Sequence, residues 1–184
     1  IYLLREFGGS EALPELAELL DDAEPGVQRE AVRAILKIGT DRGYQVLQQA
    51  LTSGTPRSRE SIMLALGSDR EERCAPLLTY ILEHVPHAGE LGWVYTKAID
   101  LLGQVRDPDS VPALRAALYR GEWWAPRRTA ALRRSAAAAL ARVGTAEAIE
   151  VLEEATASGP RSARSAARAA LASGRRGRAG GGRA

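Results

Sequence analysis

Hydrophobic residues recur along this chain with the spacing of one face of an α-helix. The clearest example is the segment 27–39, VQREAVRAILKIG, whose apolar positions fall at i, i+4, i+7, i+8 and i+11: Val27, Ala31, Ala34, Ile35 and Ile38. The basic residues of this segment stand on the opposite side of the predicted helix: Arg29, Arg33 and Lys37. The pattern predicts an amphipathic helix with a basic outer face.

Looser copies of this helix recur four more times, each after a first helix with its own apolar stripe. We therefore predict helical hairpins at residues 10–39, 40–67, 68–105, 106–144 and 145–174, after the end of a preceding repeat at 1–9. Ser10 is expected to cap the first of these helices, and Pro25 suits the start of the second. Glycines are expected to close the repeats at Gly39, Gly67, Gly103, Gly144 and Gly174.

The third and fourth hairpins are longer, because each has an insertion between its helices: HVPHAGELG at 84–92 and RGEWWAP at 120–126. Insertions confined to loops are tolerated by stacked repeats. Residues 175–184, RRGRAGGGRA, have no apolar periodicity and are predicted to be a flexible basic tail.

A single hairpin of this size cannot bury its apolar stripes alone, so each must pack against its neighbours. The predicted fold is all-α, a right-handed α-α superhelix (solenoid) of about five hairpins, in one domain over residues 1–174. The last second helix, RSARSAARAALAS, offers mostly alanine to the core, and we expect that end to fray first.

The pattern of a short acidic or proline-containing turn followed by V-x-x-x-A-x-x-A-(I/L)-L-x-(I/L)-G, seen here as VQREAVRAILKIG, resembles the HEAT repeat. In particular it is similar to the short bacterial HEAT-like type named after phycobilisome lyases. The resemblance covers nearly the whole chain and implies a solenoid. It does not imply one function, since similar arrays serve as scaffolds, adaptors, lyase subunits and nucleic-acid binders.

Composition agrees with a soluble helical domain. The 184 residues are 45% hydrophobic with a formal net charge of +2, and there is one cysteine, which excludes an internal disulfide. We expect neither a membrane span nor a signal peptide, and a cytoplasmic location. The chain does not begin with Met, and its first residues resemble the end of a second helix whose first helix is missing.

Charge is divided between the two kinds of helix: the first helices are net acidic and the second helices net basic. Second helices line the concave face of such solenoids, so we expect a basic groove there. Its candidate binding residues are Arg29, Arg33, Lys37, Trp93, Lys97, Asp100, Trp123, Trp124, Arg127, Arg128, Arg134, Arg142, Arg161, Arg164 and Arg168.

Three interpretations of these arginines remain open at this point. They could pair internally with acidic residues, for which Glu24, Asp107, Glu147 and Glu150 are available. They could form an open surface for an acidic protein, or they could bind nucleic acid.

Aromatic residues add a separate signal. Trp93 and Tyr95 begin one second helix, and Trp123 and Trp124 precede the next, so both groups are expected at one rim of the groove. Tryptophan beside arginine is typical of interface hot spots and of base-stacking platforms. One tryptophan of each group could instead cap the core, but two adjacent ones cannot both be buried.

Catalysis and metal binding are not predicted. His84 and His87 lack a strong third ligand, and Cys74 shares a face with leucines, as a buried residue does. Asp100 would suit a carboxylate in a DNA glycosylase-like groove, yet Lys97 offers it an ordinary helical ion pair.

We therefore predict a non-catalytic scaffold or adaptor without cofactor or metal, which binds another protein with an acidic surface through its concave second-helix face. The alternatives are a nucleic-acid-binding solenoid and a lyase-like chromophore-handling subunit. No membrane partner is expected.

Overall fold

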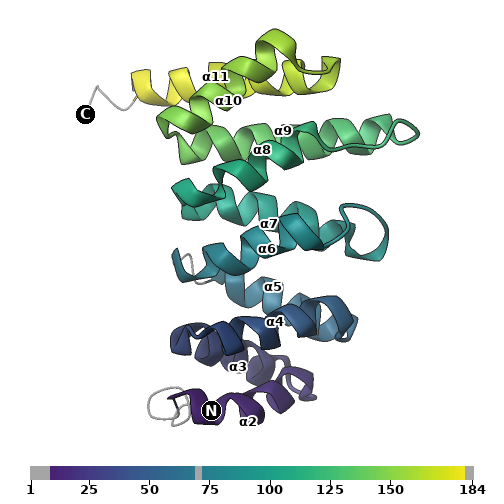
Figure 1. The fold of residues 1–184 in the computed structure, drawn as a ribbon, viewed down its shortest axis with the longest axis vertical. Helices are drawn as coiled ribbons and strands as arrows, with labels where there is room; N and C mark the ends of the chain where they lie inside the picture. The colour runs from purple at the N-terminus through teal and green to yellow at the C-terminus, as the bar shows by residue number, and fades with distance from the viewer. Residues whose placement is uncertain (1–8, 69–71, 181–184) are drawn as a thin grey trace. The chain divides into compact units, whose positions relative to one another are not determined.

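The computed structural model describes residues 9–68 and 72–180, and within these ranges the regular structure is helical (Figure 1). The α-helices are α2 (Leu13–Glu18), α3 (Pro25–Ile38), α4 (Asp41–Ser53), α5 (Pro56–Ser68), α6 (Ala75–His84), α7 (Gly92–Val105), α8 (Val111–Tyr119), α9 (Pro126–Val143), α10 (Ala146–Ser158) and α11 (Arg161–Gly180). Short 3₁₀ turns are η1 (Gly9–Ala12), η2 (Leu19–Asp21), η3 (Glu72–Cys74), η4 (Gly89–Leu91) and η5 (Pro108–Ser110). The all-α prediction is confirmed. None of the described helices is long and apolar enough to cross a lipid bilayer.

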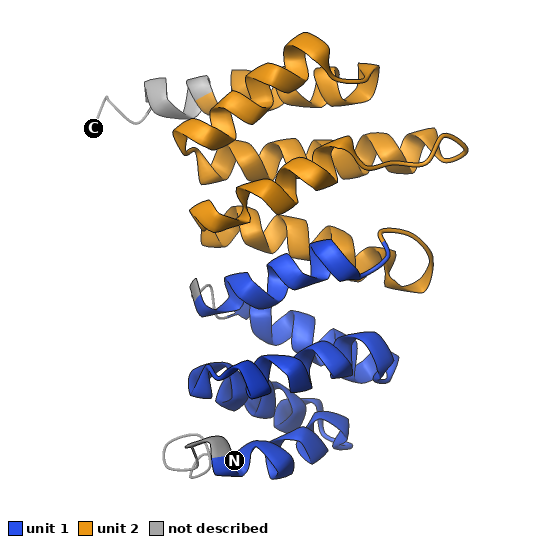
Figure 2. Ribbon diagram, in the orientation of Figure 1, with its two compact units in different colours: residues 1–86 blue, residues 87–184 orange. Residues whose placement is uncertain are grey.

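The chain divides into two compact units: unit 1 is residues 1–86 and unit 2 is residues 87–184 (Figure 2). Inside unit 1 the second helices α3 and α5 pack on each other, as do the first helices α4 and α6. Inside unit 2 the second helix α9 packs against both α7 and α11, and the first helix α8 contacts α10. Second helices thus stack on second helices and first helices on first helices, as expected for a solenoid of hairpins.

The core of α3 is wider than its apolar stripe predicts. Ala31, Ala34 and Ile35 are buried as expected, while Val27 and Ile38 are only half-buried. Further buried positions on this helix are Gln28, Val32 and Leu36. They are covered because α3 packs against α5 in addition to its own hairpin partner, so two of its faces are buried.

A recurring side-chain hydrogen bond ties second helices to the preceding turn. Helices α3, α5 and α9 begin with a proline, and the third residue after it donates to a backbone carbonyl upstream. These bonds are Gln28 Nε2 to Asp22 O at 2.7 Å, Arg59 Nε to Leu51 O at 2.9 Å, and Thr129 Oγ1 to Glu122 O at 3.0 Å. The acceptors lie in the last turn of α4 (Leu51), just after η2 (Asp22) and in the loop after α8 (Glu122), so each bond ties the start of a second helix to the segment before it.

Several predicted helix ends are wrong. Helix α2 begins at Leu13, not after Ser10, because a 3₁₀ turn precedes it and Pro14 fits only in a first turn. Gly39 and Gly144 do end helices, with left-handed φ of 65° and 69°. The other proposed closing glycines lie inside helices: Gly67 in α5, Gly103 in α7 and Gly174 in α11.

Gly103 has a packing role in place of a capping one. A Cβ at this position would lie 2.8 Å from the Ala139 Cα, so the absent side chain lets α7 approach α9. Helix α7 ends at Val105, and the residue that follows and caps it is Arg106, the one non-glycine residue with positive φ in the described part of the chain, at 62°.

The two ends of the chain are described unequally. Residues 1–8, predicted to end a preceding repeat, lie outside the described residues, as do residues 181–184 of the predicted tail. Helix α11 includes residues 175–180, the start of that tail. Its buried residues are alanines, as the sequence indicates: Ala163, Ala166, Ala167 and Ala170.

Candidate binding face

The predicted binding residues of unit 2 lie on its three second helices or in the loop before α9. We call the following set the second-helix face: Trp93, Lys97 and Asp100 of α7, Arg127, Arg128, Arg134 and Arg142 of α9, and Arg161, Arg164 and Arg168 of α11. All of these side chains are exposed except those of Asp100 and Arg164, which are half-buried.

Most arginines of this face have no internal partner. No ion pair or side-chain hydrogen bond joins any of the following to another residue in the ranges that the structure describes: Arg127, Arg134, Arg142, Arg161, Arg164 and Arg168. The reason is local, since neither α9 nor α11 contains an acidic residue. The positive charge of these helices is therefore available to a ligand.

The internal pairing that the sequence left open is found elsewhere. Glu24, Asp107, Glu147 and Glu150 form no ion pair with a described basic residue. Asp107 instead accepts a hydrogen bond from the Asp109 backbone N–H at 3.2 Å, as a cap of η5. The ion pair between first helices joins Arg115 of α8 to Glu154 of α10 at 2.9 Å.

Two further arginines of α9 hold the structure together. Arg128 lies 3.4 Å from Glu122 Oε2. Arg133 donates to the carbonyls of Tyr119 and Arg120 at 3.1 and 3.2 Å, and to the Ser162 hydroxyl of α11. Burial lowers the pKa of the Arg133 guanidinium below its ordinary value. Arg133 thus connects α9 by hydrogen bonds both to the start of the inserted loop and to α11 of the neighbouring repeat.

The predicted basic stripe of unit 1 is more fully engaged. Arg33 forms an ion pair with Glu30 in the same helix, and Lys37 also interacts with a neighbouring group. Arg29 is half-buried and has no hydrogen bond or ion pair to the described residues. The same stripe pattern therefore leaves fewer open charges on α3 than on α11.

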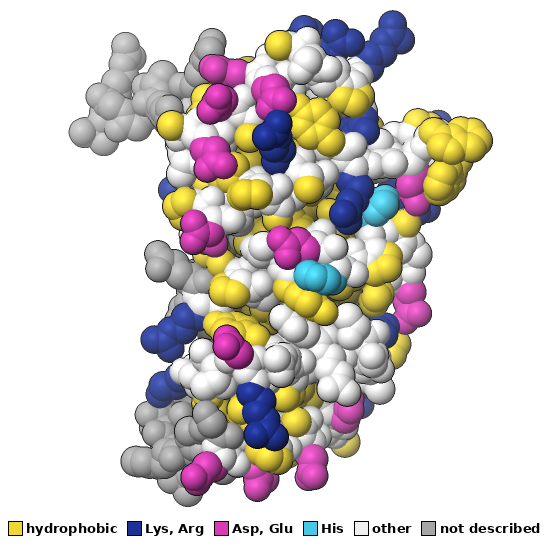
Figure 3. Space-filling model, in the orientation of Figure 1, with side chains coloured by type: hydrophobic (Ala, Val, Ile, Leu, Met, Phe, Trp, Pro, Cys, Tyr) yellow, Lys and Arg dark blue, Asp and Glu magenta, His cyan; other side chains and the backbone are white. Residues whose placement is uncertain are grey.

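Trp123 and Trp124 form an exposed pair on the loop between α8 and α9. Their side chains are 88% and 65% exposed, and their rings meet edge to face with centroids 5.7 Å apart. Hydrophobic side chains gather at the tip of this loop in Figure 3. Neither ring caps the core, so the interpretation of one buried tryptophan is wrong here.

Hydrogen bonds fix the turn that carries this pair. The Glu122 backbone N–H donates to Thr129 Oγ1 at 2.8 Å, and the Ala125 N–H donates to the Glu122 carbonyl at 3.2 Å. An anchored turn loses little conformational entropy when its side chains bind a ligand.

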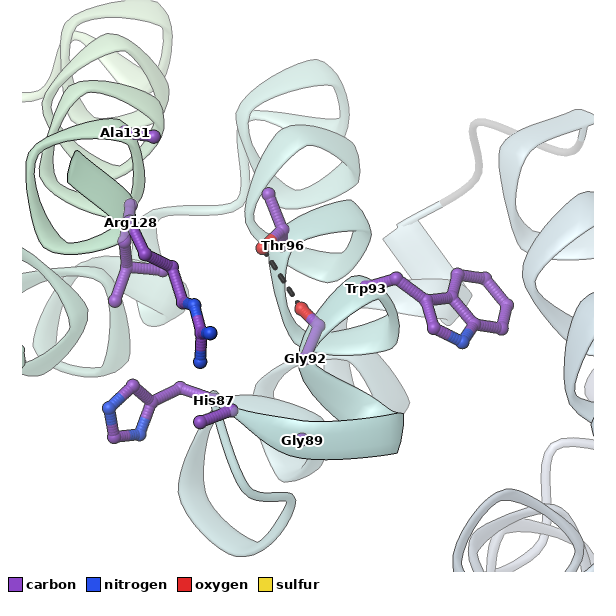
Figure 4. A pocket seen from close by; sticks show the side chains of 9 residues that line it. His87, Gly89, Gly92, Trp93, Thr96, Arg128 and Ala131 are labelled. Carbon is purple, nitrogen blue, oxygen red and sulfur yellow. Dashed lines mark hydrogen bonds between the residues drawn. The ribbon is translucent and has the colours of Figure 1, made fainter. Parts of the chain in front are cut away.

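A cleft of about 400 Å³ opens where α7 and α9 begin (Figure 4). In Figure 4 Arg128 points toward His87, while the Trp93 indole points away from both. The Thr96 hydroxyl, also in the wall, donates to the Gly92 carbonyl at 3.0 Å. A neighbouring hollow is lined by Trp124, Ala125, Pro126, Arg127 and Arg128. Arg128 lines both, and so connects the two predicted aromatic groups.

Tyr95 is the core aromatic that sequence reasoning missed. It is fully buried, and its hydroxyl has no hydrogen-bond partner among the described residues. Arg120 lies over its ring, 5.6 Å from the centroid, and His87 meets the ring edge. Burial raises the pKa of the Tyr95 hydroxyl, and Arg120 partly offsets this effect. The sequence does contain a signal for this burial, because Tyr95 stands on the same helical face as Ala98, Ile99 and Leu102.

The remaining candidates for chemistry have structural surroundings. Among the described residues, no group of three His, Cys, Asp or Glu side chains is placed to hold a metal ion. His84 stacks on Tyr80 with ring centroids 4.2 Å apart. Cys74 is buried, as its position among leucines predicts.

Comparison with known proteins places these hairpins in a wider context. A family model described as HEAT repeats matches residues 1–67 and 88–172. A structure of human deoxyhypusine hydroxylase in complex with glycerol is 21% identical and aligns over 92% of this chain and 76% of its own, with a TM-score of 0.43. A designed armadillo repeat protein is 18% identical over 91% of this chain and 89% of its own, with a TM-score of 0.36. A search of curated proteins found no match.

Proposed function

This chain belongs to the HEAT repeat family, and from that premise we propose that it is a non-catalytic scaffold that binds an acidic protein through the second-helix face of unit 2. HEAT repeats generally mediate protein–protein interactions. The observation that carries the proposal is the set of exposed arginines on α9 and α11 that lack an internal partner. We place this interaction inside the cell, where a lone buried thiol such as that of Cys74 stays reduced.

Charge and aromatic groups have separate roles in this mechanism. Distributed arginines orient an acidic surface and raise its association rate, because they attract it before contact. Trp123 and Trp124 supply apolar anchors on a fixed turn, and such rings commonly carry most of the binding free energy.

A second candidate is single-stranded nucleic acid. The observation that favours it is the proximity of Trp124 to Arg127 and Arg128 in one hollow, since aromatic rings beside basic groups stack on bases. We rank it second because the arginines of α11 lie in a different repeat from the tryptophans.

Affinity capture with matched variants tests the proposal. We expect wild-type protein to retain a specific acidic partner, Arg164→Glu combined with Arg168→Glu to lose it, and the control Arg29→Glu to keep it. Purified partner is then titrated against each variant, and against Trp123→Ala combined with Trp124→Ala, whose exposed rings can be removed without loss of folding. Equal retention by all variants would contradict the proposal.

The same proteins distinguish nucleic acid by salt dependence. We expect little binding to a generic single-stranded oligonucleotide or to generic duplex DNA at physiological ionic strength. Micromolar DNA binding that falls steeply with salt and is abolished by Arg134→Glu combined with Arg164→Glu would reverse the ranking.

A further inference from the structure

Unit 2 contains a second, larger cavity at the other end of its second helices. Its volume is about 630 Å³, within the range of ordinary ligand sites. It is formed by the end of α9 and the middle of α11 together with α10, and its polar lining includes Arg106, Arg142 and Glu153. Along α9, Arg142 stands fourteen residues after Arg128, or about 20 Å along the helix axis. This groove is therefore separate from the cleft and the tryptophan pair.

The floor of the groove is apolar and open to solvent. Val143, Ile149 and Leu171 line it and are half-buried, with alanines of α9 and α11 between them. A ligand that covers such side chains is bound more tightly, because apolar surface is removed from water. An apolar side chain of a ligand would fit this floor.

Arg106 at the groove edge has an unfavourable backbone conformation. The positions where α3 and α9 end in the same left-handed conformation are occupied by Gly39 and Gly144, which adopt it without steric cost. Arginine has a Cβ that disfavours this conformation, so stability alone would favour glycine. Its exposed side chain has no hydrogen bond or ion pair to any residue in the described ranges. Strain retained at an open cavity points to a role in binding.

Electrostatics then select the ligand. Arg106 and Arg142 are both unpaired within the described chain, and the one carboxylate in the lining, Glu153, is unpaired as well. The groove thus has net positive charge over an apolar floor. Arginine binds carboxylates with two parallel hydrogen bonds, which gives both affinity and orientation.

We propose that this groove binds a short acidic segment of a partner protein, with an apolar side chain on the floor and a neighbouring carboxylate at Arg106 and Arg142. This inference rests on the proposed function in that the ligand is again acidic protein. It uses a different surface, which shares only Arg142 with the second-helix face.

Three blocked peptides test the chemistry of the groove by NMR titration. The probe is acetyl-Leu-Leu-Glu-Glu-amide; acetyl-Leu-Leu-Gln-Gln-amide removes the charge, and acetyl-Ser-Ser-Glu-Glu-amide removes the apolar part. We expect saturable shifts at the amides of Ile149 and Leu171 and at the Arg106 Nε–H with the first peptide. The other two should bind at least about tenfold more weakly, since each lacks one set of contacts.

Two variants then locate the peptide. Arg106→Gly removes the guanidinium and relieves the backbone, so it folds at least as well, and we expect it to weaken the probe about tenfold. The control Arg161→Gln lies on the second-helix face and should leave peptide affinity unchanged, while it weakens capture of the acidic partner.

The opposite results would overturn the inference. Unchanged affinity in Arg106→Gly, or peptide shifts confined to the tryptophan loop, would show that the groove is not the site. Loss of peptide binding in Arg161→Gln but not in Arg106→Gly would place the peptide on the second-helix face, which contradicts the groove and supports the proposed function. Peptide binding at the groove with no effect of Arg164→Glu and Arg168→Glu on capture would support the groove as a peptide site and contradict the proposed function.

Discussion

Helices α3 and α11 occupy equivalent places in their hairpins and carry similar basic stripes, yet they use them differently. In α3 an acidic residue stands three positions before Arg33 and pairs with it, whereas α11 has no acidic residue. Three arginines of α11 therefore have no internal partner among the described residues and can contact a ligand: Arg161, Arg164 and Arg168. The spacing of the arginines alone does not decide whether they are paired; the presence or absence of an acidic residue one turn away does.

The same two helices differ in their cores. Helix α3 buries Val32, Ile35 and Leu36, while every buried residue identified in α11 is alanine. Alanine removes little apolar area from water, so α11 contributes less to stability than α3 does. The comparison shows that α3 has the larger apolar core and α11 the more open arginines, which is why the proposed binding face is placed on α11.

The largest expected effect is on the core of α3. Ile35→Ala should lower the free energy of unfolding by about 2 to 5 kcal/mol, because it leaves a cavity between packed helices. The counterpart Ala167→Gly in α11 should cost about 1 kcal/mol, chiefly through helix propensity. Native-state hydrogen exchange, followed helix by helix, measures both values. Equal losses at the two sites would break the comparison.

Next in size is a change that makes α11 resemble α3. Ser165→Glu places a carboxylate three residues before Arg168 and four after Arg161, so it should occupy both guanidinium groups. We expect partner affinity to fall about tenfold, or about 1.4 kcal/mol, with stability unchanged. Ser165→Gln is the matched control and should bind as wild type does. Calorimetric titration of the captured partner distinguishes them.

Helix ends give a third, smaller contrast. Arg106→Gly should raise the free energy of unfolding by about 1 kcal/mol, because glycine adopts the left-handed conformation without strain. The reciprocal change Gly39→Arg should lower it by a similar amount. Urea denaturation of both variants tests this pair, and a destabilised Arg106→Gly would mean that the arginine is needed for folding.

The smallest effect concerns the ion pair of α3. Glu30→Gln removes the charge of one ion-pair partner of Arg33 and should change stability by less than about 0.5 kcal/mol, since both side chains are partly exposed. The loss of one negative charge on α3 should give unit 1 a small gain in affinity for acidic polypeptides. Glu60→Gln on α5 serves as the control, and thermal unfolding with a binding titration records the outcome. A loss above 1 kcal/mol would show that this pair is a major part of the fold.

Periodicity predicted the hairpins and their insertions well, because each helix must bury a stripe whatever its partner. It failed where contacts between repeats decide, as at Gly103, which looks like a helix end but is the close contact between α7 and α9. The adjacency of Trp123 and Trp124 predicted that at least one of them is exposed, but not that both are. Their fixed turn was not predictable, because it depends on a hydrogen bond from Glu122 to Thr129, seven residues further along the chain.

Pairing of the arginines was only partly accessible from sequence. Glu30 stands one turn from Arg33 in the printed chain and pairs with it, although it is not among the four acids that the sequence offers as partners: Glu24, Asp107, Glu147 and Glu150. The groove at Arg106 was not predictable, since three helices contribute its walls and none of them shows it alone.

One titration tests the central claim that α11 presents open arginines whereas Arg33 of α3 is held in an ion pair. Poly-L-glutamate is added to the labelled protein at low and at physiological ionic strength, and the arginine Nε–H signals are followed by NMR. We predict saturable shifts for Arg161, Arg164 and Arg168 that weaken with salt, and little change for Arg33. Shifts of Arg33 as large as those of α11, or none in α11, would contradict the account.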